Sequence, residues 1–304
     1  MQILEDAFEA DLHDIKFATH RKAVIGDKTV EVIRLGMSGN LAYEIHGPIT
    51  EFEEVYRKVW VSGQKFGATK LGMRAYSLFN HTEAGFPNIH LHYPMPWLET
   101  GEDMAKHMFE NPQMSWQQLN RKLAGSVGDD LEIRFMTPFD VGWDFLVKFD
   151  HDFIGREALE AAQKNIRRKP VTLEWNAEDV AAVFATMLKP GEEACENITG
   201  DTECEYVASA FKGEFSFRAD KVLFAGKEIG ISSGRIISYH YNSMISLGFI
   251  DPDYTKEGTE LTLIWGTPGT RQMTIRVKVA KFPYNGDFTR NENKDVEEIP
   301  RYSK

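Results

Sequence analysis

The chain has 304 residues, of which 42% are hydrophobic and 12% aromatic, so it is long enough for two globular domains and does not have the composition of a disordered protein. Its net charge of −11 argues against broad binding to nucleic acid or to an anionic membrane surface. No apolar run approaches the ~20 residues of a membrane helix, and the N-terminus lacks the order of a signal peptide. The two cysteines suit a reduced cytoplasm. We therefore expect a cytoplasmic protein with neither a nucleic-acid nor a membrane partner.

The first part of the chain mixes predicted helices and strands. Residues 1–20 favour a short helix followed by a strand at 15–18, and residues 22–34 favour two strands joined by a turn at Gly26 and Asp27. A stretch with two glycines, Gly36 and Gly39, leads into a strand-like run at 41–45. We expect a helix over 51–65, capped by Thr50, with Phe52 among its apolar positions.

The middle of the chain predicts one helix at 116–123, a strand at 145–149 and a helix from 153 to about 165. A charge cluster at 167–170 marks a domain boundary. Beyond it, short strand-like runs alternate with turns, which predicts a small all-β barrel or sandwich. These runs lie at 171–175, 206–210, 221–224, 230–238, 245–250, 260–265 and 274–280. The resulting α+β division is a first domain at 1–168, a β domain at 169–290 and a tail at 291–304.

Glu44 lies in the strand-like run between apolar neighbours. A carboxylate buried there would need a donor, either an internal arginine or a nitrogen-rich ligand, because an unpaired buried charge is costly. The alternative is an edge strand from which Glu44 points to water. The pattern alone leaves both interpretations open.

Four stretches, in order, resemble the glycine-cleavage T-protein, the folate-dependent aminomethyltransferase. The first is Arg34–Ile45, similar to R-x-G-Y-T-G-E-x-G-(Y/F)-E-(I/L), and the second is Leu71–Arg74 with Glu83–Gly85, separated by a longer insert than in that family. The third is Pro138–Leu159. The fourth comprises short motifs of the C-terminal β domain, at 230–234, 246–250, 258–261 and 282–284. The resemblance implies a partial aminomethyltransferase-like folate-binding domain at 1–168, followed by the C-terminal β domain.

Within that superfamily, the insert at 75–82 and the stretch Phe149–Arg156 look most like the tetrahydrofolate-dependent O-demethylases of lignin-derived methoxy-aromatics, such as vanillate and syringate. These enzymes leave 5-methyltetrahydrofolate and a catechol. The resemblance begins well inside the family's first domain, and the family's N-terminal third has no counterpart here. In the T-protein that third includes the catalytic aspartate. We therefore expect a truncated product, one half of a split enzyme, or a domain with a changed role.

The resemblance assigns roles to four residues. Glu44 matches the glutamate that binds the pterin, whose adjacent amino group and ring N–H suit one carboxylate. Met37 stands where the T-protein has a tyrosine, and Arg74 matches an arginine that would contact a folate or substrate carboxylate or pair with Glu83. Tyr76 is the predicted catalytic group, because a phenol can share a proton with a leaving phenolate of similar basicity.

Histidines 81, 90 and 92 invite a metal interpretation, and two of them would share one face of a strand. No cysteine or carboxylate stands nearby at a ligand spacing, and the family uses no metal, so we predict none. His81, His92 and Tyr93 are instead predicted to line the side of the pocket that holds the aromatic substrate, or simply to fill a polar groove.

Three functions follow from the resemblance. The first is tetrahydrofolate-dependent O-demethylation of methoxy-aromatic acids of the vanillate or syringate type. The second is aminomethyl or N-methyl transfer from a methylamine-type substrate. The third is a non-catalytic folate-binding half of a split or degenerate enzyme. Surface that the absent third would cover favours association, so we expect a homodimer or a partner chain that carries that segment.

Overall fold

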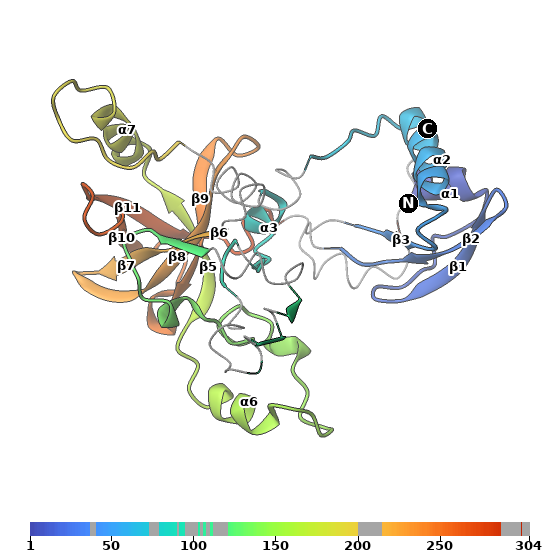
Figure 1. Ribbon diagram of the computed structural model, residues 1–304, viewed down its shortest axis with the longest axis horizontal. Coiled ribbons are helices and arrows are strands. Elements are labelled where there is room, and N and C mark those ends of the chain that lie inside the picture. Colours follow the sequence, from blue (N-terminus) through green and yellow to red (C-terminus); the bar gives the residue numbers. More distant parts are fainter. Residues whose placement is uncertain are drawn as a thin grey trace. The chain divides into compact units, whose positions relative to one another are not determined.

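The computed structural model describes residues 1–36, 41–72, 79–89, 91–94, 103, 106–107, 110–111, 121–199, 215–286 and 299 (Figure 1). The chain forms two compact units. Unit 1 comprises Met1–Tyr76 together with Asn285–Lys304, and unit 2 comprises Ser77–Tyr284.

Unit 1 is a three-stranded antiparallel sheet with helices packed on one face. The strands are β1 (His20–Ile25), β2 (Lys28–Ile33) and β3 (Glu44–His46), in the order β1-β2-β3. Helices α1 (Gln2–Phe8) and α2 (Phe52–Lys65) lie side by side against the sheet (Figure 1). The predicted pair of strands with its turn at Gly26 is confirmed. The apolar residues between the helices and the sheet form one core, which contains Leu4, Phe8, Leu12, Ile15, Ala23, Ile25, Val30, Val32 and Val55.

The sheet of unit 1 follows the two-residue period of a strand. On β2, Val30 and Val32 are buried under the helices, whereas Glu31 between them is only half-buried. The register pairs Val32 with Ile45, and Ile45 packs against the same core. Glu44 and His46 therefore extend from the other face of β3.

Two local predictions for unit 1 are wrong. Residues 15–18 form a turn-rich segment instead of a strand, and Ala18 has the left-handed φ of 58°. Helix α2 begins one residue later than a cap at Thr50 would require. Its N-cap is Glu51, whose side chain makes no capping hydrogen bond. Phe52, one of the apolar positions of the predicted helix, is 61% exposed and lines a pocket.

Unit 2 is built around a closed six-stranded barrel in the order β10-β11-β5-β9-β8-β7, so the predicted C-terminal β domain is confirmed as a barrel. All six strands overlap predicted runs. Their bounds are Lys169–Trp175 for β5, Asp220–Phe224 for β7, Lys227–Ser238 for β8, Ser243–Ile250 for β9, Glu260–Trp265 for β10 and Met273–Ala280 for β11. The interior is lined by completely buried aliphatic side chains, including Leu173, Val222, Leu263 and Ile275. The predicted run at 206–210 lies outside the described residues.

The other elements of unit 2 surround the barrel. The helices are α3 (Asn80–Glu83), α6 (Arg156–Gln163) and α7 (Ala177–Thr186), and the 3₁₀ turns are η3 (Glu132–Arg134), η4 (Asp144–Leu146) and η5 (Pro252–Tyr254). A parallel pair joins β4 (Arg121–Ala124) to β6 (Phe215–Arg218). The predicted helix at 116–123 is wrong for its described part, because residues 121–124 find a strand partner far along the chain. The predicted strand at 145–149 is replaced at its start by η4.

The predicted domain boundary after residue 168 coincides with the first barrel strand, since β5 begins at Lys169. The compact units divide the chain differently, because residues 77–168 group with the barrel and residues 285–304 group with the N-terminal unit. Among the described helices, none has both the length and the apolar character needed to cross a membrane.

Candidate functional site

The predicted site residues fall into three groups. Glu44 lies in unit 1, and His81, His92 and Tyr93 lie close together in unit 2. Met37, Arg74 and Tyr76 lie outside the described residues, so their roles stay predictions.

Glu44 begins the short edge strand β3, on the sheet face that points away from α1 and α2. Its side chain is 43% exposed. The carboxylate Oε2 lies 2.8 Å from Nε2 of His46, two residues further on the same face. Because a carboxylate has no proton to give, the imidazole Nε2–H is the donor. Glu44 is thus a solvent-accessible acceptor whose internal partner among the described residues is His46.

This sheet face carries further charge. Lys22 on β1 lies opposite Glu31 on β2, and Glu31 lies opposite His46 on β3. Nδ1 of His20 is 3.4 Å from a carboxylate oxygen of Glu31. The face therefore holds two histidine–glutamate pairs side by side. Such an array of acceptors suits a ligand rich in N–H groups.

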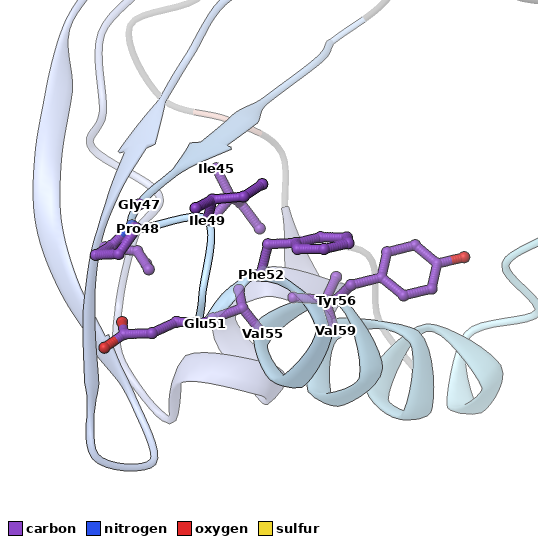
Figure 2. A pocket seen from close by; sticks show the side chains of 10 residues that line it. Ile45, Gly47, Pro48, Ile49, Glu51, Phe52, Val55, Tyr56 and Val59 are labelled. Carbon is purple, nitrogen blue, oxygen red and sulfur yellow. The ribbon is translucent and has the colours of Figure 1, made fainter.

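The opposite face of β3 borders a different feature, an apolar pocket of about 300 Å³ between the sheet and α2. Figure 2 shows Ile45 contributing from the strand and Phe52 and Tyr56 from the helix. Since Ile45 and Glu44 extend from opposite faces of one strand, this pocket is separate from the Glu44 carboxylate. The apolar positions of α2, predicted from the sequence, contribute Phe52, Val55 and Val59 to its lining.

In unit 2, His92 is buried, and both of its ring nitrogens have hydrogen-bond partners within the protein. Its Nδ1 accepts a hydrogen bond from the backbone N–H of Asn88 at 2.9 Å, so the ring proton resides on Nε2. That Nε2 is 3.2 Å from Oγ1 of Thr82, which itself donates to the carbonyl of Gly234 on β8. Burial, and to a lesser degree the neighbouring His81, lowers the pKa of His92 to about 3. His92 is therefore a neutral link between the segment 80–92 and the barrel.

His81 and Tyr93 border an aromatic cluster that includes Phe86 and Trp143. The ring centroids are 5.6 Å apart for His81 and Phe86, 5.2 Å for Phe86 and Trp143, and 6.4 Å for Tyr93 and Trp143. Burial raises the pKa of Tyr93 to about 12, which keeps the phenol protonated at neutral pH. Contact of His81, His92 or Tyr93 with substrate stays a prediction. For Glu83, the structure gives a partner in Ser238, whose hydroxyl donates to Oε1 at 2.6 Å.

Among the described residues, one group combines metal-binding side chains, namely Glu5, Asp11 and His13. Nδ1 of His13 is 2.5 Å from Oε1 of Glu5, and that same oxygen accepts the backbone N–H of Leu12 at 2.9 Å. The carboxylate of Asp11 accepts the backbone N–H of His13 at 3.1 Å. These hydrogen bonds stabilise the turn that follows α1, and they suffice to explain why the three side chains lie close together.

Comparison with known proteins places these features in a family. The model of the GCVT N-terminal domain matches residues 1–91. A sesamin methylene transferase of Sinomonas sp. (strain No.22) is 46% identical over 99% of this chain. A syringate O-demethylase of Sphingobium sp. is 33% identical over 94% of it. The chain belongs to the aminomethyltransferase (T-protein) superfamily.

The structure agrees with this membership. An aminomethyltransferase T from Bartonella henselae covers 93% of the chain with a TM-score of 0.55 at 16% identity, which supports the aminomethyltransferase fold. The chain spans 66% of the length of the sesamin enzyme, 61% of the syringate enzyme and 56% of the Bartonella chain. The predicted family and its O-demethylase-like branch are confirmed by these relatives.

Proposed function

We propose that this chain supplies the folate-binding and barrel parts of a tetrahydrofolate-dependent transferase that takes a one-carbon group from an aromatic ether. The observation that carries the proposal is the match along nearly the whole chain to two relatives whose names describe such transfers. One is named for removing methylene from sesamin and the other for removing methyl from syringate. Tetrahydrofolate is the shared acceptor in this proposal.

Glu44 binds the pterin in this proposal. The pterin edge offers an amino group and a ring N–H side by side, and a carboxylate accepts both at once. The half-exposed carboxylate on the helix-free face of the sheet supports this role. Met37 and Arg74 complete the cofactor contacts, and Arg74 takes a carboxylate of the folate tail or of the substrate.

Tyr76 protonates the leaving oxygen. In methyl transfer, the C–O bond of the aryl ether breaks, an N5–C bond forms, and the N5 proton is lost as the phenolate gains one. In methylene transfer, two C–O bonds break, two N–C bonds form at N5 and N10, and two protons move from nitrogen to the two aryl oxygens. Neither reaction needs an oxidant or a reductant. Positioning of the carbon between nitrogen and oxygen is the main demand.

The oxidation state of the folate product decides between the two substrates. The purified protein is incubated with tetrahydrofolate and either vanillate or syringate, or a methylenedioxybenzene. Production of 5-methyltetrahydrofolate with a catechol supports the O-demethylase prediction, and 5,10-methylenetetrahydrofolate supports methylene transfer. Tyr76→Phe should lower turnover with little change in folate affinity. Unchanged turnover would contradict the proton-donor role.

In a second candidate function, this chain binds folate by itself but converts substrate only when a further polypeptide segment completes the enzyme. It is favoured by the third or more of each relative that this sequence does not match. We propose that this portion completes the catalytic site, either on the same polypeptide or on a partner, which could be a second copy of the chain. Folate binding without turnover, together with turnover when the corresponding segment of the sesamin enzyme is added, would support it.

A further inference from the structure

We infer that His46 is a positioning residue that holds the Glu44 carboxylate ready for the pterin. This inference rests on the proposed function of Glu44. It starts from the 2.8 Å hydrogen bond between Nε2 of His46 and Oε2 of Glu44. Both side chains are about half-exposed, at 56% for His46 and 43% for Glu44, so the pair lies where a ligand can reach it.

The short strand explains why Glu44 needs such a partner. β3 has only three residues and pairs only with β2 among the described strands. A glutamate has three rotatable side-chain bonds, and fixing them on binding costs free energy. A donor two residues away on the same face restrains the carboxylate before the ligand arrives. Each carboxylate oxygen has two acceptor sites, so Oε2 can hold His46 and still accept from the pterin, while Oε1 takes the second pterin donor.

The surroundings of His46 explain why the imidazole stays in place. Glu31 lies directly opposite His46 on β2, so the imidazole has a carboxylate on its own strand and another on the neighbouring strand. On the far side of Glu31, the same face carries Lys22, which lies opposite Glu31 on β1. It also carries His20, whose Nδ1 is 3.4 Å from Oε2 of Glu31. Each carboxylate on this face therefore has a histidine beside it, His46 beside Glu44 and His20 beside Glu31.

The side-chain lengths provide a sharp set of variants. Nε2 of glutamine and Nε2 of histidine are the same number of bonds from Cα, so His46→Gln keeps a donor near Oε2. His46→Phe keeps a planar ring and the strand preference but removes the donor. His20→Phe is the matched control, because it removes the other histidine–glutamate pair on the same face without touching Glu44. Glu44→Gln tests the acceptor itself.

Affinity for tetrahydrofolate is measured by calorimetric titration of each variant, and thermal unfolding confirms that each is folded. We expect His46→Phe to weaken binding about five- to tenfold, a moderate loss because the pair is half-exposed. His46→Gln and His20→Phe should stay within about twofold of the parent. Glu44→Gln should lose most of the affinity, since it replaces an acceptor of the pterin donors by an amide nitrogen.

The outcomes separate the two claims. If Glu44→Gln abolishes binding but His46→Phe stays within twofold, His46 does not position Glu44 and the folate function stands. Equal losses for His46→Phe and His46→Gln would also overturn the inference, because the donor would not be the cause. If the parent chain does not bind tetrahydrofolate, the proposed folate site fails. Nitrogen-15 spectra then test the geometry directly: the Nε2–H tautomer of His46 should be present in the parent and change in Glu44→Gln, and an unchanged spectrum would overturn the inference.

Discussion

The clearest test of the fold concerns Arg218, at the end of β6. Its Nε and Nη2 bind the two oxygens of Asp220 at 2.9 and 3.1 Å, and its Nη1 binds Oε2 of Glu196 at 2.6 Å. The guanidinium lies 3.5 Å from the centre of the Trp265 ring. The side chains of Arg218 and Asp220 are only 6% and 4% exposed. The change Arg218→Met keeps an apolar stem over the ring but leaves two carboxylates without their cation.

Removing one partner of a buried ion pair typically costs about 3–5 kcal/mol, because the remaining charge is stranded away from water. For a unit of about two hundred residues, each kcal/mol lowers Tm by about 2–4 °C, so we expect a fall on the order of 10 °C. Urea unfolding followed by tryptophan fluorescence measures the free energy, and the ring of Trp265 reports on the site itself.

Arg276→Met is the matched control. Arg276 also binds two acids, with Nη2 at 2.8 Å from Asp179 and 3.4 Å from Glu178, but its side chain is 61% exposed. Water and salt can replace its contacts, so the variant should unfold close to the parent. If the two arginine variants lose similar stability, burial does not set the value of these pairs and our reasoning is refuted.

Further predictions concern unit 2. The pKa of His92 is about 3 in the folded protein and about 6.5 in the unfolded chain, so between these pH values the unfolded chain binds more protons. The free energy of unfolding should therefore decrease as the pH is lowered from about 6.5 to 3, by up to ~1.4 kcal/mol per pH unit. His92→Gln should reduce that slope in urea titrations. Gly234→Ala should lower Tm, since φ is +63° and the new Cβ would lie 2.2 Å from Nε2 of His92; an unchanged Tm would contradict this contact. Burial alone would raise the pKa of Glu196, but hydrogen bonds from Thr267 and Arg218 bring it below its usual value. Its stabilising contribution is therefore present above about pH 4.5 and lost as the pH falls through the folded pKa, and Glu196→Gln should remove this loss.

The barrel could be predicted because its information is local. Runs such as 171–175 and 260–265 are rich in residues that favour strands, and turn residues separate them. Strand order and closure were not predictable in the same way. The pair of β4 and β6 shows why, since Arg121–Ala124 becomes a strand only through a partner at Phe215–Arg218. Local propensity carries no record of that distant partner.

The site was predictable only in part for the same reason. The strand period that sets Glu44 apart from Ile45 also puts His46 on the face of Glu44, yet Gly47 and Pro48 directly after it mark a turn, so the local pattern does not single His46 out. The environment of His92 depends on Gly234, which no local pattern connects to it. A histidine that resembles a ligand in the sequence can therefore be a buried link in the fold.

Gly36 offers a test of how Glu44 is placed. A Cβ at Gly36 would lie 2.1 Å from Cβ of Ala42, so the side chain of Ala42 leaves no room for one. Gly36 and Ala42 lie just beyond Ile33 and Glu44, the last residues that pair between β2 and β3. We call this close approach of the two chain segments the neck. Gly36→Ala should force the neck apart at a cost of about 1–3 kcal/mol, and it should weaken tetrahydrofolate binding by displacing Glu44.

Two further variants make this prediction strict. Among the described residues, no atom lies within 4 Å of where a Cβ at Gly72, in the same unit, would stand, so Gly72→Ala should change neither stability nor affinity appreciably. The double change Gly36→Ala with Ala42→Gly moves the methyl group across the neck and removes the clash, so it should recover much of both losses. Failure to recover would mean that Gly36 is needed for its own backbone conformation, and that the contact with Ala42 does not set the position of Glu44.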